Sequence, residues 1–128
     1  MRINWKRVMV AALCSELLLL VIRFSLLRYD GPGRYALNLA THFIPLFLGG
    51  LWVARKIESR FVLHGVLVGV VANLLLILIA PIFMQLAEPT TERIAGALLS
   101  IPIKILGSGI GAYVGGRRRN KLLSAQTG

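Results

Sequence analysis

The sequence predicts an all-α polytopic membrane protein: a four-helix transmembrane bundle that forms one domain over residues 1–128. Hydrophobic residues make up 56% of the chain, and its mean hydropathy of +0.74 is above that of an ordinary soluble domain. Only 16% of the residues are charged, and most of them lie between four long apolar runs. Lipid excludes charge in this way, so the pattern predicts four membrane spans.

The first apolar run covers residues 8–27, a length of about 20 residues that matches ~30 Å of hydrocarbon. Basic residues and Trp5 precede it, as at a membrane interface. A cleavable signal peptide also begins with basic residues. This run is too long for one, contains Glu16 and Arg23, and has no small-x-small cleavage site. We therefore expect a retained helix.

The second and third runs cover residues 36–54 and 61–80, and a turn rich in Gly and Pro precedes the second. The third run stays apolar to residue 86, which predicts a tilted helix or a bend near Pro81. The turn between these runs is short and carries basic anchors. This predicts that the two spans are antiparallel neighbours. The anchors are Arg55, Lys56 and Arg60.

The fourth run covers residues 94–116 and ends in a basic cluster that includes Arg117, Arg118 and Arg119. We expect residues 122–128 to form a short, frayed tail. Lys and Arg number three before the first span, three in the middle turn and four after the last span, against three on the other side. The positive-inside rule therefore predicts a multi-pass protein of the cell (cytoplasmic) membrane with both termini in the cytoplasm.

A weak internal repeat relates the ends of the second and fourth spans. Residues 50–56 and 111–117 both read small, x, aromatic, Val, small, x, basic, and a proline precedes each in its span. One interpretation is a parallel duplication of a two-helix hairpin. The alternative is that any helix running from the outer to the inner surface ends in aromatic and then basic residues.

Glycines spaced four residues apart predict close helix packing. One stripe is Gly107, Gly111 and Gly115 in the fourth span, and a shorter one is Gly65 and Gly69 in the third. Without Cβ atoms, such stripes let helix backbones approach each other in lipid. We expect an intrachain contact for the third-span stripe. The fourth-span stripe faces either another span or a second copy of the chain.

Polar residues at membrane depth are the candidate functional residues. Glu16 and Lys104 have opposite charges near mid-span, and Asn73 lies at a similar depth on the Gly65–Gly69 stripe. The three side chains either line a shared site or form a structural set. In the structural set, Glu16 and Lys104 neutralise each other, with the first and fourth spans as neighbours in a closed four-helix arrangement, and Asn73 bonds an adjacent helix. A lone His42 makes a poor metal site.

The run Gly49-Gly50-x-x-x-Ala54-Arg55-Lys56, followed by His64-Gly65-x-x-x-Gly69, resembles a signature of small four-span bacterial membrane proteins of unknown function. The resemblance covers about a fifth of the chain. It implies a bacterial cytoplasmic-membrane protein and no particular activity. His64, beside the basic turn, is expected at the interface.

The chain is also similar to the small multidrug exporters, which are four-span proteins with a membrane-embedded glutamate in the first helix. Glu16 matches that glutamate. The aromatic residues of the exporters' cation site have no clear counterparts here, and Lys104 would oppose a cationic substrate. This resemblance implies a proton-coupled small-molecule transporter that acts as a homodimer, which is the alternative function.

No serine-histidine-acid set, phosphate loop or zinc motif occurs in the sequence, so we expect neither an enzyme nor a cofactor. The chain has a net charge of +10 but no basic soluble domain that would bind nucleic acid. This charge favours contact with the bilayer and its anionic headgroups on the cytoplasmic side over nucleic acid. The leading prediction is a structural or regulatory membrane protein that packs with itself, as a homo-oligomer, or with a larger membrane partner.

Overall fold

The computed structural model describes residues 3–26, 29, 31–84 and 90–126. These residues form four α-helices and no strand: α1 (Trp5–Leu26), α2 (Arg34–Lys56), α3 (Phe61–Met84) and α4 (Thr91–Gln126). All four are long and apolar enough to cross a membrane. The predicted all-α four-helix bundle is therefore confirmed for this part of the chain.

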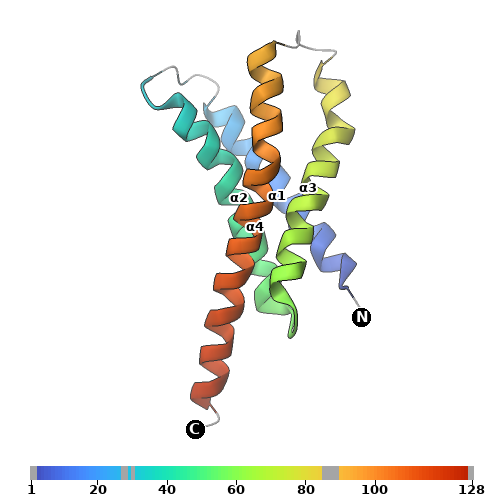
Figure 1. The fold of residues 1–128 in the computed structure, drawn as a ribbon, viewed down its shortest axis with the longest axis vertical. Coiled ribbons are helices and arrows are strands. Elements are labelled where there is room, and N and C mark those ends of the chain that lie inside the picture. Colours follow the sequence, from blue (N-terminus) through green and yellow to red (C-terminus); the bar gives the residue numbers. More distant parts are fainter. Residues whose placement is uncertain (1–2, 27–28, 30, 85–89, 127–128) are drawn as a thin grey trace.

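Successive helices run in opposite directions, so both termini lie at the same end of the bundle as the α2–α3 turn (Figure 1). We call this end the terminal end, and the end with the α1–α2 and α3–α4 connections the far end. The α2–α3 turn spans residues 57–60, because Arg55 and Lys56 still belong to α2. Arg60 adopts a left-handed backbone conformation, with a φ of 52°, immediately before α3 begins.

The helices extend beyond the expected spans at several ends. The α1 helix begins at Trp5 rather than at residue 8, and α3 continues through Pro81 to Met84. The largest difference is in α4, which stays helical to Gln126, so the prediction of a frayed tail was wrong from residue 122 to residue 126. At 1.5 Å per residue, the 36 residues of α4 are about 54 Å long. Its last turns extend past the other helices at the terminal end (Figure 1).

The packed core lies in the terminal half of the bundle. It consists of small and branched apolar side chains from the first three helices, with Val8, Leu46, Val53, Val68 and Ala72 fully buried. The far half is different: between residues 74 and 82 of α3, and between 94 and 99 of α4, no described side chain is buried. Figure 1 shows α2 leaning away from α4 in this half.

Candidate functional site

The site is built on α4, which lies between α2 and α3 and presents small residues to both. A Cβ atom on Gly107 would lie 3.0 Å from the Phe43 carbonyl oxygen of α2, and one on Gly115 would lie 2.9 Å from the Leu51 carbonyl oxygen. A Cβ on Gly111 would overlap the Phe47 carbonyl outright. The fourth-span stripe therefore faces another span of the same chain.

The third-span stripe also packs within the chain, against the neighbouring face of α4. A Cβ on Gly69 would lie 2.7 Å from the Cα of Ile105, and one on Gly65 would lie 2.6 Å from the carbonyl oxygen of Ser108. Several of the α4 residues that meet α3 are themselves small, namely Ser108, Ala112 and Gly116. Two adjacent faces of α4 thus allow close approach, one toward α2 and one toward α3.

This close packing brings the charged groups of Glu16 and Lys104 together at the centre of the bundle. Lys104 Nζ lies 2.5 Å from Glu16 Oε1 and donates a hydrogen bond to it. The lysine side chain is 0% exposed and the glutamate side chain 12%. A single charge in such a place is costly, whereas an ion pair with a short hydrogen bond offsets much of the desolvation.

The expectation that the first and fourth spans are neighbours was wrong. Among the described residues, no Cα atom of α1 lies within 8 Å of one in α4. The two helices lie on a diagonal of the bundle, and α2 and α3 contact each other between them. The long Lys104 side chain crosses this diagonal to reach Glu16. The ion pair therefore links these two helices directly, although their backbones are not adjacent.

Polar groups of the other two helices lie at a similar depth. At 1.5 Å per residue, Asn73 is about 18 Å along α3 from Phe61, and His42 is about 20 Å along α2 from Arg55. Asn73 donates its side-chain amide to the Ile101 carbonyl of α4, with an N···O distance of 3.2 Å. Glu16 and Lys104 of the predicted set are thus in contact, Asn73 bonds the α4 backbone one turn before Lys104, and His42 of α2 is buried.

Two atoms of this polar set have no hydrogen-bond partner within the described chain. They are His42 Nδ1 and Asn73 Oδ1. His42 precedes Phe43, whose carbonyl oxygen would lie 3.0 Å from a Cβ on Gly107, so His42 lies close to the level of Lys104 along the bundle. The described residues hold no group of three or more His, Cys, Asp or Glu side chains that would bind a metal ion.

At the terminal end, a second cluster of contacts joins α1 and α4 to the end of α2 and the α2–α3 turn. Arg7 of α1 donates to the Lys56 carbonyl, and Arg119 of α4 donates to the Ile57 carbonyl at 2.6 Å. Arg119 also lies 3.7 Å from exposed Glu58, a contact of little energetic weight in water. The other predicted basic anchors have exposed side chains, namely Arg55, Lys56, Arg60, Arg117 and Arg118.

His64 lies in the first turn of α3, beside the α2–α3 turn, and its side chain is buried. Its Nε2 accepts a hydrogen bond from the Asn4 backbone N–H at 3.3 Å, and its Nδ1 lies 3.0 Å from the Arg60 carbonyl oxygen. This pattern requires a neutral ring with the proton on Nδ1. His64 therefore ties the start of α1 to the start of α3.

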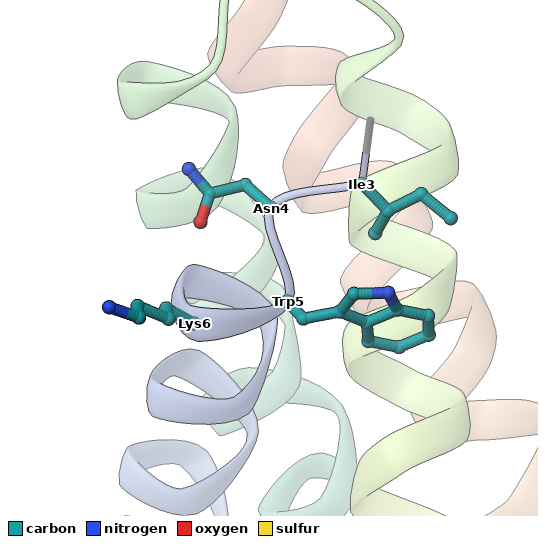
Figure 2. A pocket seen from close by; sticks show the side chains of 4 residues that line it. All are labelled: Ile3, Asn4, Trp5 and Lys6. Carbon is teal, nitrogen blue, oxygen red and sulfur yellow. The ribbon is translucent and has the colours of Figure 1, made fainter. Parts of the chain in front are cut away.

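A shallow hollow lies next to this region, lined by Ile3, Asn4, Trp5 and Lys6. Figure 2 shows Ile3 and Trp5 on one side of the chain, and Asn4 and Lys6 on the other. The polar groups do not converge on a common point, so the hollow is a weaker candidate for a site than the buried polar set.

Sequence reasoning missed several residues that hold the site in place. Gly49 and Gly50 were noted only for a resemblance, yet Gly49 packs against Ser15 of α1 and Gly50 against the Ser108 backbone of α4. Ser15 donates to the Pro45 carbonyl at 3.1 Å. The two adjacent glycines face two different neighbouring helices. The Gly-Gly pair is visible in the sequence and could have indicated close packing of this helix on two sides.

Comparison with known proteins gives no relative: no family profile, curated protein or solved structure matches the chain.

Proposed function

We propose that this protein is a small, non-enzymatic protein of the cytoplasmic membrane that acts by packing against another transmembrane segment. The segment belongs to a second copy of the chain or to a larger membrane protein. The observation that carries this proposal is that no described side chain is buried between residues 74 and 82 of α3 or between residues 94 and 99 of α4. Each helix of a closed bundle buries a stripe along its length, so these two half-helices have room for a partner.

Gly96 supports the proposal because it lies in that half of α4 and is open. A Cβ built on Gly96 meets nothing within 4 Å, whereas one built on Gly107, Gly111 or Gly115 meets the backbone of α2. Ala95 and Ala97 beside it are exposed. Small residues on an uncovered helix face allow a partner helix to approach closely, which favours helix–helix contact over lipid alone.

The proposed topology places the terminal end in the cytoplasm. The excess of Lys and Arg at that end supports this orientation. The exposed side chains of Arg55, Lys56, Arg60, Arg117 and Arg118 support contact with anionic headgroups there.

The test compares the mass of the protein's complexes in nanodiscs for wild type and two variants. Gly96→Leu adds bulk to the open face of α4, and Cys14→Leu adds bulk to an exposed position of α1 as the matched control. We expect wild type and Cys14→Leu to form a complex, and Gly96→Leu to remain a single chain with unchanged stability. A complex that survives in Gly96→Leu, or a wild type that is always a single chain without a partner, contradicts the proposal.

A proton-coupled transporter is the second candidate, and the polar atoms His42 Nδ1 and Asn73 Oδ1 favour it because they have no partner in the described chain. The Glu16–Lys104 pair counts against it, since a coupling carboxylate has to exchange its partner. Proton uptake into liposomes separates the candidates. A transporter requires a substrate-driven flux that Glu16→Gln abolishes while the protein still folds.

A further inference from the structure

Two buried atoms that need hydrogen bonds lie near Lys104. His42 is 4% exposed and Asn73 is 6% exposed, and neither His42 Nδ1 nor Asn73 Oδ1 has a partner in the described chain. Buried polar atoms in proteins are nearly always bonded, and in hydrocarbon no bulk water is available to bond them. Each of these two atoms therefore indicates that a ligand is bound there.

Contacts among three helices place these groups at a similar level of the bundle. Asn73 of α3 is held by the Ile101 carbonyl, one helical turn before Lys104 on α4. His42 of α2 directly precedes Phe43, whose carbonyl oxygen would lie 3.0 Å from a Cβ on Gly107, about one turn after Lys104 on α4. The Lys104 ammonium has three N–H donors, and the hydrogen bond found for it in the described chain uses one of them, toward Glu16.

The donor and acceptor types restrict the chemistry of the ligand. Asn73 Nδ2 donates to the Ile101 carbonyl, which fixes the amide so that Oδ1 can only accept. Lys104 can only donate. The ligand must therefore donate to Asn73 and accept from Lys104. A chloride or carboxylate cannot donate, and a metal cation would be repelled by the ammonium. A small neutral molecule that both donates and accepts satisfies both groups.

We propose that Lys104, His42 and Asn73 bind one water molecule at the centre of the membrane span. The water accepts a hydrogen bond from Lys104 Nζ and donates to His42 Nδ1 and Asn73 Oδ1. Three hydrogen bonds are the usual number for a buried water in a protein. This water links α2, α3 and α4, while the Glu16–Lys104 pair adds α1. The inference is independent of whether the protein binds a partner or transports a solute.

The test uses nitrogen-15-labelled histidine in the full chain, reconstituted in nanodiscs, and measures magnetisation transfer from water protons to the ring nitrogens. The chain supplies its own control, because His64 is also buried but both of its ring nitrogens contact protein groups. We expect a water signal at His42 Nδ1 and none at His64. No water signal at His42 in the wild type would overturn the proposal.

Two variants test whether His42 and Asn73 share the same water. Asn73→Leu removes one of the three hydrogen bonds, so the water signal at His42 should fall about fivefold. In a chain with nitrogen-15-labelled asparagine, His42→Leu should weaken the water signal at the Asn73 amide to a similar extent, which covers the case in which Asn73→Leu does not fold. A signal that is unchanged by the reciprocal substitution would overturn the proposal.

Discussion

Replacing one residue of the Glu16–Lys104 pair should destabilise the protein more than replacing both. Glu16→Leu leaves an ammonium that is 0% exposed, and Lys104→Met leaves a carboxylate that is 12% exposed. Breaking a buried pair from one side costs about 3–5 kcal/mol. In a membrane the unfolded helices also find partners, which lowers the expected value, so we predict about 3 kcal/mol for each single substitution.

The double variant carries no buried charge at this place. Replacement of a whole buried pair by apolar side chains of similar size is often close to neutral, so it should cost below about 2 kcal/mol. Additive effects would total about 6 kcal/mol. The expected coupling energy is therefore at least about 4 kcal/mol, well above the scatter of about 0.5 kcal/mol for independent sites.

The assay is reversible unfolding in mixed micelles by titration with a denaturing detergent, with the free energy of unfolding measured for all four proteins. The swapped variant, Glu16→Lys with Lys104→Glu, should recover part of the loss because it keeps opposite charges on the same two helices. Strict additivity in the cycle would refute direct pairing. Glu16 would then be free to exchange its partner, and the transporter hypothesis would become the stronger one.

Three further predictions concern packing, topology and the terminal end. Gly111→Leu should cost at least about 3 kcal/mol because its side chain overlaps the Phe47 carbonyl, whereas Leu17→Ala, at a position 62% exposed, should cost below about 0.5 kcal/mol; equal detergent stability would contradict this. Reporter fusions after Gln126 and after Gly31 should give cytoplasmic and external signals respectively, and an external C-terminus would reverse the proposed orientation. Arg119→Leu should lower the free energy of unfolding by about 1 kcal/mol through its lost bond to Ile57, and exposed Arg118→Leu should leave it unchanged; identical values for the two would show that the bond has no weight.

The sequence predicts the helices well because lipid imposes a strong constraint. Apolar runs of bilayer length lie close to the helices that the structure describes. The limits of α4 were harder to predict, since residues 117–126 are polar and basic, and hydropathy places only the part of a helix that lies in lipid. The helix continues there because nothing in that stretch, such as Pro or Gly, breaks it.

The partners within the bundle were only partly predictable. Opposite charges at similar depth indicate that Glu16 and Lys104 meet, because each alone would be costly. Depth does not show which helices are adjacent. Lysine is long enough to cross a diagonal, so a pair of side chains does not require a pair of touching helices. The small residues Gly49, Gly50 and Ser108 let α2 pack closely against α1 and α4. Their role depends on where these helices cross, and the sequence of one helix alone does not determine that point.

The central claim is that the far half of α3 and α4 contacts another protein in the membrane. Photo-cross-linking in living cells tests it most directly, with a benzophenone amino acid at Leu98 of α4 and, as the control, at Leu17 of α1. The two side chains are equally exposed, at 63% and 62%. We predict a discrete protein adduct at Leu98 and none at Leu17, and the adduct's mass will show whether the partner is a second copy. An absence of protein adducts at Leu98, or the same adducts at both positions, would contradict the claim.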